Sequence, residues 1–322
     1  MNKTYRPTWA EIDLDALSYN FKSLKRLSSG KTVIPVVKAN AYGHGAKAVT
    51  EHLHTCHGVK LFAVSLVEEA LELRETRLDI DILIMGPVRP GDLEIISKNN
   101  LIFTLTNETV YAALKHTDLP LRFHVKIDTG MHRLGFSDLN TLKAIFNDAA
   151  SSETLSLEGV YTHFATADSD ERYFLKQKKA FENLLIRLPY IPRVVHAANS
   201  STVIKYEPEI KRTTHSRVGI SLYGYSLEGR LHHIRPVMAL RTRVMEMKHL
   251  SSGDYLGYGI TYRASSHEVI AILPVGYADG WIRKNQGGAV IIDGTPYPIV
   301  GRVCMDMTFV KVDDSVDLYD EV

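Results

Sequence analysis

Short apolar runs recur between residues 32 and 223, and this rhythm constrains the fold more than any other feature of the sequence. Helix-like segments lie between most of the runs, for example Val67–Arg74 and Arg172–Leu188. Strands that alternate with helices form parallel sheets, and eight such units are typical of a (β/α)8 barrel. The predicted strands are Val33–Lys38, Leu61–Leu66, Ile80–Gly86, Leu101–Thr106, Leu121–Asp128, Leu157–Phe164, Val194–Asn199 and Val218–Tyr223. We therefore predict an α/β fold built on a TIM-like barrel.

The rhythm changes after Tyr225. From Pro236 onward, strand-like runs follow one another with turn residues between them and no convincing helix. These runs are Val237–Met247, Val269–Val275, Ala289–Ile292, Ile299–Met305 and Phe309–Val312. The change predicts a barrel domain over residues 12–235 and a separate, mostly β domain over residues 236–322, with residues 1–11 as a candidate further strand of the β domain.

Charge and cysteine content argue against several kinds of partner. The 38 Lys and Arg residues against 37 Asp and Glu residues give a net charge of +1, which argues against nucleic acid or a membrane surface as the main partner. Cys56 and Cys304 lie far apart without metal-ligand spacing, so we expect no metal site and a reducing compartment. The chain has neither a signal-peptide core nor an apolar run near the ~20 residues that cross a bilayer. We expect a cytoplasmic protein.

The first predicted barrel strand ends in a lysine. Lys38 follows the apolar run of Val33 to Val37, and burying an ammonium group costs several kcal/mol. A lysine at the mouth of a buried strand can have its pKa lowered until the free amine is accessible, which an imine-forming nucleophile needs. A side chain that extends to the surface is the alternative. The loop at residues 40–45 is polar and contains two glycines, which suits close approach of a ligand.

Other polar residues also gather near the ends of the predicted strands. They are Lys38, Ser65, Thr104, Lys126, Asp128, His163, His196, Asn199 and Arg217. Each alone is more often a loop residue or a satisfied core residue. Barrel enzymes place their catalytic residues at the carboxyl ends of the strands. Because several predicted strands carry polar residues near that end, we predict one common site there.

Residues 37–45, Val-Lys-Ala-Asn-Ala-Tyr-Gly-His-Gly, resemble the pyridoxal-phosphate attachment motif of alanine racemases. Further segments match that family in the same order, at residues 130–135, 163–168, 196–200, 216–224, 257–262, 276–280 and 304–307. The resemblance implies a fold-type-III enzyme that interconverts L- and D-alanine, supplying D-alanine for peptidoglycan. It also implies a homodimer whose active site is shared between subunits. Lys38 would form the imine with the cofactor and serve one face of the substrate, and Tyr258 of the partner chain would serve the other.

The resemblance also assigns residues to the cofactor. Arg217 would face its pyridine nitrogen, and because an arginine keeps its proton, that nitrogen would stay unprotonated. His163 would bridge Tyr258 and Arg217, and His196 would pack against the cofactor ring. Neutral donors would hold the phosphate. The residues implied to bind the cofactor are Lys38, Tyr42, His163, His196, Asn199, Ser200, Arg217, Gly219 and Ile220.

Substrate contacts are implied in the same way. The guanidinium of Arg133 is suited to hold a substrate carboxylate, together with the backbone amide of Met305. Lys126 is a candidate for carbamylation that would orient Arg133. Tyr277 would stand where the substrate arrives, and Asp306 would form an inner gate.

The sequence departs from the resemblance at its end. Val322 falls inside a strand-and-turn pattern, whereas alanine racemases continue through further strands that include a tyrosine near the phosphate. The resemblance therefore implies a β domain truncated at its C-terminus. Two alternatives stay open: a serine or broad-specificity racemase of the same fold, and a form that binds pyridoxal phosphate without turnover. A decarboxylase is disfavoured, because it needs an acidic group where Arg217 stands.

Overall fold

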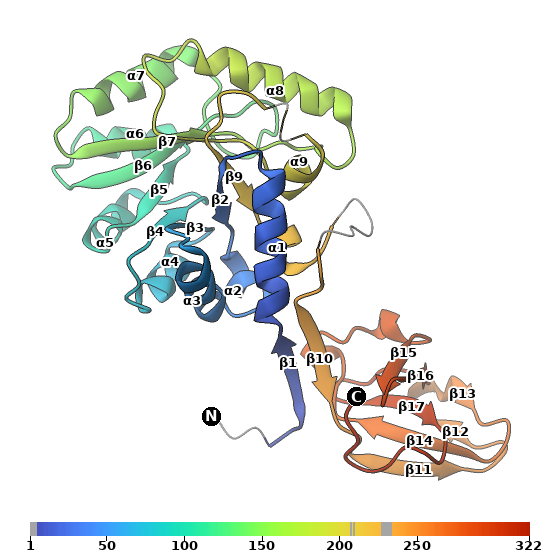
Figure 1. Ribbon diagram of the computed structural model, residues 1–322. Coiled ribbons are helices and arrows are strands. Elements are labelled where there is room, and N and C mark those ends of the chain that lie inside the picture. Colours follow the sequence, from blue (N-terminus) through green and yellow to red (C-terminus); the bar gives the residue numbers. More distant parts are fainter. Residues whose placement is uncertain (1–4, 207, 209, 227–233) are drawn as a thin grey trace. The chain divides into compact units, whose positions relative to one another are not determined.

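The computed structural model describes residues 5–206, 208, 210–226 and 234–322, and the chain forms two compact units (Figure 1). The barrel unit runs from Asp13 to Val237, and the β unit combines the residues up to Ile12 with Met238–Val322. Residues 1–4 of the candidate N-terminal strand lie outside the described residues. Within the described part of the chain, every helix is too short or too polar to cross a membrane.

The barrel unit is built on an eight-stranded parallel sheet with the order β2-β9-β8-β7-β6-β5-β4-β3. A bridge between Val36 and Ala63 joins the two outer strands of this order, so the sheet closes on itself. The strands are β2 (Thr32–Pro35), β3 (Leu61–Val64), β4 (Asp81–Ile84), β5 (Ile102–Leu105), β6 (Leu121–Lys126), β7 (Leu155–Tyr161), β8 (Val194–His196) and β9 (His215–Val218). The predicted fold class is confirmed.

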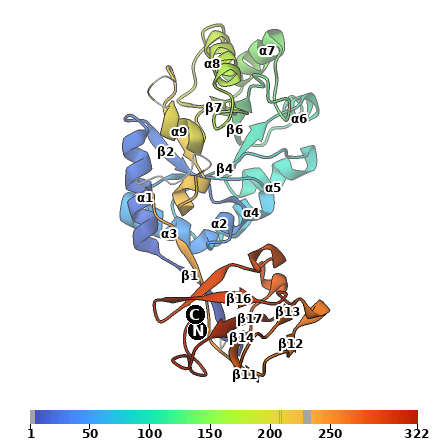
Figure 2. The same ribbon diagram turned by 90° about the vertical axis from the view of Figure 1, so that its right-hand side faces the viewer.

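Helices that precede or separate these strands bury one face each and surround the sheet (Figure 2). They are α1 (Leu14–Leu27), α3 (Ala46–His57), α4 (Val67–Arg74), α5 (Leu93–Lys98), α6 (Glu108–Leu114), α7 (Leu139–Ala150), α8 (Glu171–Leu185) and α9 (Ser200–Lys205), with the 3-10 turn η1 (Pro90–Asp92). In α8 the buried residues Phe174, Phe181 and Leu185 recur at helical spacing. Asp170 caps the same helix by accepting the amide of Tyr173.

The last predicted barrel strand is wrong. The run Val218–Tyr223 was predicted as a strand, but β9 spans His215–Val218 and the 3-10 helix η3 spans Ile220–Tyr223. A short apolar run does not distinguish a buried strand from a buried helical turn, and the true strand carries the polar residues of its inner face. Arg217 therefore lies within the strand, where its side chain is 3% exposed.

The β unit contains a five-stranded antiparallel sheet with the order β11-β14-β17-β16-β15 and two strand pairs, β1-β10 and β12-β13. Its strands are β1 (Thr8–Ile12), β10 (Met238–Thr242), β11 (Glu246–Leu250), β12 (Tyr255–Leu256), β13 (Tyr262–Arg263), β14 (Glu268–Leu273), β15 (Ala289–Ile292), β16 (Thr295–Val300) and β17 (Thr308–Val312). Short 3-10 turns are η4 (Tyr258–Ile260), η5 (Tyr277–Asp279) and η6 (Arg283–Asn285). Alternate residues of the central strands, such as Val269, Ala271 and Val310, form its core.

Candidate active site

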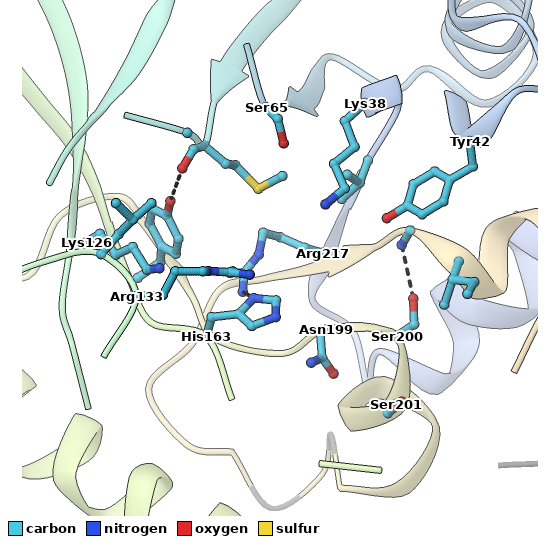
Figure 3. A pocket seen from close by; sticks show the side chains of 17 residues that line it. Lys38, Tyr42, Ser65, Lys126, Arg133, His163, Asn199, Ser200, Ser201 and Arg217 are labelled. Atoms are coloured by element: carbon cyan, nitrogen blue, oxygen red, sulfur yellow. Dashed lines mark hydrogen bonds between the residues drawn. The ribbon is translucent and has the colours of Figure 1, made fainter. Parts of the chain in front are cut away.

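A cavity of about 320 Å³ lies at the carboxyl ends of the barrel strands, where barrel enzymes place their catalytic groups. Figure 3 shows the side chains of Lys38 and Tyr42 extending into it. Most of the predicted site residues line this cavity: Lys38, Tyr42, Lys126, Arg133, His163, Asn199, Ser200, Arg217, Gly219 and Ile220.

The backbone that carries Lys38 is unusual. The short element α2 (Lys38–Tyr42) follows strand β2, and its residues from Ala39 to Tyr42 have φ values between +50° and +54°. This left-handed turn contains no glycine, and each such residue costs about 1–2 kcal/mol relative to a right-handed conformation. Strain of this kind persists only where the surrounding structure holds it.

Hydrogen bonds hold the left-handed turn from two neighbouring elements. Glu69 of α4 accepts the amide of Ala39 at 2.6 Å and the amide of Ser65 at 2.8 Å. The side-chain oxygen of Asn40 accepts the amide of Ala46, at the start of α3, at 2.8 Å. Nothing in the sequence pattern indicates a role for Glu69 in this turn, yet its carboxylate ties the turn to the end of strand β3.

Removing the Glu69 carboxylate is expected to loosen the turn. The amides of Ala39, Ser65 and Leu66 would lose a charged acceptor, and a hydrogen bond to a charged group contributes about 1.5–3 kcal/mol. We expect Glu69→Ala to lower the free energy of unfolding by about 2–3 kcal/mol, measured by urea denaturation. Glu68→Ala, an exposed neighbour on the same helix, is the control. Equal stability of the two variants would contradict this role of Glu69.

Hydroxyls and backbone amides converge at one part of the cavity. The amide of Gly219 donates to the Ser200 hydroxyl at 3.0 Å, and the amide of Ser221 donates to the same oxygen at 3.5 Å. A Cβ atom at Gly219 would lie 2.4 Å from the Tyr42 hydroxyl, so the absence of a side chain lets the backbone approach this group. Amides and hydroxyls in this arrangement bind oxyanions such as phosphate without a cation.

Arg217 lines the cavity and is held by several acceptors. Its Nη1 donates to His196 Nδ1 at 2.6 Å. Its Nη2 donates to the carbonyl oxygens of Thr162 and Ala197 at 2.9 and 3.1 Å, and it lies 3.3 Å from His163 Nδ1. These contacts fix the orientation of the guanidinium group. Because arginine stays protonated at any working pH, the cavity contains a permanent cation at this point.

The two histidines beside Arg217 occupy different positions. Burial, followed by the charge of Arg217, lowers the pKa of both His163 and His196 well below the ordinary value, so both rings are neutral. His163 lines the cavity, whereas His196 is fully buried and outside its lining. Tyr161 lines the cavity instead and stacks on His196 with ring centroids 4.5 Å apart. Nothing in the sequence pattern singled out Tyr161 as a cavity residue. The packing of His196 against the cofactor ring stays a prediction.

Lys126 ends strand β6 inside the cavity and is 3% exposed. Burial, and then the charges of Arg133 and Arg217, lower its pKa to about 8. Part of the Lys126 population is therefore the neutral amine near neutral pH. In the following loop, Asp128 accepts the amide of His132 at 3.0 Å. This turn places the neighbouring Arg133 on the cavity lining.

The remaining predicted site residues lie in the β unit: Tyr258, Tyr277, Met305 and Asp306. Tyr258 is 70% exposed and stands between Gly257 and Gly259, which both have a φ of +71°. The amides of Tyr277 and Ala278 donate to the carbonyl oxygens of Cys304 and Met305 at 3.1 and 2.9 Å. The fold therefore brings Tyr277 beside Met305. Among the described residues, no group of three or more His, Cys, Asp or Glu side chains is placed to hold a metal ion.

Family models match both units of the chain. A model described as "Alanine racemase, N-terminal domain" matches residues 12–227, and one described as "Alanine racemase, C-terminal domain" matches residues 237–322. The alanine racemase of Staphylococcus carnosus is 39% identical over 327 residues, which cover 98% of this chain and 84% of that protein.

Solved structures of alanine racemases are similar to this chain over nearly its whole length. The alanine racemase from E. faecalis superposes with a TM-score of 0.91 at 35% identity, covering 98% of this chain and 88% of that one. The alanine racemase of Bacillus anthracis, with bound L-Ala-P, superposes with a TM-score of 0.88 at 35% identity, covering 99% of this chain and 85% of that one.

Proposed function

Because the chain belongs to the alanine racemase family, we propose that its barrel cavity holds pyridoxal phosphate, the cofactor on which this family depends. The activity of the chain is that of an alanine racemase, the interconversion of L- and D-alanine. The predicted family and activity are confirmed. The observation that carries the cofactor proposal is the meeting of Lys38, Arg217 and the hydroxyl and amide groups around Gly219 in one cavity.

The groups in the cavity fit the cofactor in three places. Lys38 supplies an amine for covalent attachment. Tyr42, Ser200 and the backbone at Gly219 supply neutral donors for a phosphate. Arg217 supplies a cation that cannot give up its proton to a ring nitrogen. When bound, pyridoxal phosphate supplies an electron sink that makes the Cα–H bond of an amino acid acidic enough to break.

We propose that the chain serves the two faces of the substrate with two bases. The Lys38 amine takes or returns the proton on one face. The Tyr258 hydroxyl takes or returns it on the other, and a second copy of the chain supplies this residue. The 70% exposure of Tyr258 supports this arrangement, since the side chain is available for contact with another subunit. A symmetric homodimer would then contain two equivalent sites.

We propose that the substrate carboxylate is held by Arg133 and by the backbone amide of Met305, with Tyr277 and Asp306 shaping the access route.

A neutral Lys126 amine reacts with carbon dioxide to give a carbamate and a proton, and the resulting anion would pair with Arg133. The lowered pKa of Lys126 supports this step. Carbon-13 NMR with labelled bicarbonate tests it: a carbamate signal is expected that is lost in Lys126→Met.

In buffer free of carbon dioxide, Lys126 is expected to make stability depend on pH. The folded chain releases the Lys126 proton near pH 8, whereas an ordinary lysine releases it near pH 10.5. The unfolded state therefore binds more protons between these values, and the free energy of unfolding should rise with pH across this window. Relative to Lys126→Met, we expect a rise of about 2–3 kcal/mol, measured by urea denaturation at pH 7.5, 9 and 10. The same dependence of unfolding free energy on pH in the unchanged protein and in Lys126→Met would contradict the lowered pKa of Lys126.

We also propose a cytosolic location. Both cysteines of the chain, Cys56 and Cys304, are free thiols, one exposed and one buried. Free thiols are usual in the reducing cytosol, whereas secreted proteins more often use cysteines in disulfides.

The test of the proposed function is a racemisation assay. Purified protein with pyridoxal phosphate is incubated with L-alanine in D2O, and both the D-alanine formed and the deuterium at Cα are measured. We expect conversion toward equal amounts of the two enantiomers, faster with L-alanine than with L-serine. Equal rates would favour the broad-specificity alternative. Cofactor absorbance without deuterium incorporation would mean binding without turnover.

A further inference from the structure

Two histidines form a hydrogen-bonded pair inside the barrel, on the side of Arg217 away from the cavity lining. His124 of β6 and His196 of β8 are both fully buried, and His124 Nδ1 lies 2.9 Å from His196 Nε2. Burial lowers the pKa of His124 to about 3 and that of His196 well below its ordinary value. Both rings are therefore neutral, and each has one donor nitrogen and one acceptor nitrogen.

The tautomers of the pair follow from Arg217. A guanidinium group has only donors, so His196 Nδ1, which lies 2.6 Å from Arg217 Nη1, must be an acceptor. The proton of His196 is then on Nε2 and is donated to His124 Nδ1. The proton of His124 is in turn on its Nε2. Each of these hydrogen bonds is therefore donated in the same direction, from Arg217 to His196 and from His196 to His124.

Stability alone does not account for His124. Its Nε2 is buried without a hydrogen-bond partner among the described residues, and an unsatisfied buried donor costs about 1–3 kcal/mol. The fold nevertheless makes room for the ring. A Cβ atom at Gly159 of β7 would lie 2.7 Å from three of the ring atoms, and the register between β6 and β7 shifts between Phe123 and His124. An apolar side chain would remove this donor but leave the Nε2–H of His196 without its acceptor, so the number of unsatisfied buried donors would stay the same.

We propose that His124 is a positioning residue for racemisation. By accepting the Nε2–H of His196, it keeps the opposite nitrogen of that ring aimed at Arg217. The inference rests on the proposed role of Arg217 toward the cofactor ring. Without the acceptor, the His196 Nε2–H would itself be buried and unsatisfied, so the ring is driven to rotate or to change tautomer. Rotation removes an acceptor from the guanidinium, and the other tautomer places N–H against N–H.

Two substitutions separate positioning from packing. His124→Leu removes both ring nitrogens at similar volume, whereas His124→Asn keeps an acceptor oxygen near the position of Nδ1. We expect His124→Leu to lower kcat by about 10–100-fold, as small misplacements in a site do, with the KM for alanine changed less than about threefold. His124→Asn should retain kcat within about threefold of the unchanged protein. Thermal unfolding of the cofactor-free His124→Leu protein should occur within a few degrees of the unchanged protein, because one unsatisfied buried donor, on His196, replaces another, on His124.

Nitrogen-15 NMR of the histidine rings gives a readout that does not depend on turnover. In the cofactor-free protein, both rings should be neutral with the proton on Nε2 from pH 6 to 9, the His124 signals being those lost in His124→Leu. A protonated ring or an Nδ1–H tautomer in either histidine overturns the inference. So does an unchanged kcat in His124→Leu, or equal losses of activity in the Leu and Asn variants. If the unchanged protein does not racemise alanine, the proposed function fails, and the NMR result still decides the tautomers.

Discussion

Lys38→Ala is expected to lower kcat for racemisation by at least about 10⁴-fold, because the substitution removes both the attachment point of the cofactor and one of the two bases. The fold should persist. The left-handed turn after Lys38 is held by backbone groups and by Glu69 and Asn40, not by the Lys38 side chain. Urea denaturation should therefore give an unfolding free energy close to that of the unchanged protein. The measurement is the conversion of L- to D-alanine with excess pyridoxal phosphate.

Lys47→Ala is the matched control for this loss. Lys47 lies on α3, is exposed and pairs with Glu75 at 2.8 Å, so its removal changes the net charge by the same amount without touching the cavity. An exposed ion pair contributes little to stability, and we expect activity within about twofold of the unchanged protein. A Lys38→Ala protein that retains more than about 1% of the activity would contradict the role assigned to Lys38, since loss of a general base alone costs at least ~10²-fold.

Much of the site was predictable because its residues sit where strands end. Lys126 and His163 follow apolar runs of strand length, and the carboxyl ends of parallel strands meet at one face of a barrel. The resemblance to a known family then attached roles to these positions. Arg217 was assigned to the site although its strand was misplaced, since the family motif identified the residue independently of the secondary structure.

The left-handed turn was not predictable from residue types. The residues Ala39 to Tyr42 include no glycine, and alanine and tyrosine rarely adopt positive φ. Tertiary contacts decide the conformation here, and the hydrogen bond from the Ala39 amide to Glu69 is one of them. The one available signal was the position of Glu69 three residues after Leu66, as in a capping box. The adjacent Glu68 carries the same side chain and does not make these contacts, so composition alone could not choose between them.

The roles of the buried residues Tyr161 and His124 could not be recognised from the sequence pattern. Tyr161 ends an apolar run and reads as an ordinary core aromatic residue, and His124 reads as a core histidine in the middle of a strand. Their roles depend on which side chain lies across the barrel, and His196 comes from a strand 72 residues further along. Contacts at this separation become visible only when the sheet closes.

Tyr258→Phe is expected to lower kcat by about 10²–10⁴-fold. The proton exchange that Lys38 performs on its own face of the substrate should remain. The phenyl ring keeps the shape of the side chain but has no proton to exchange. Stability should not change, since the Tyr258 side chain is 70% exposed. In D2O, the enantiomer whose Cα–H faces Lys38 should still exchange that hydrogen with solvent, and the other should not. Tyr255→Phe, at an exposed tyrosine of β12, is the control and should retain full activity.

Mixing two inactive variants decides which subunit supplies Tyr258. If each site combines Lys38 of one chain with Tyr258 of the other, a heterodimer of Lys38→Ala and Tyr258→Phe chains has one intact site and one doubly defective site. Random re-association makes half of the dimers mixed, so about a quarter of the unchanged activity should return. If both residues came from one chain, every site would lack one base and no activity would return. The second result would place the site within a single subunit and overturn the shared arrangement.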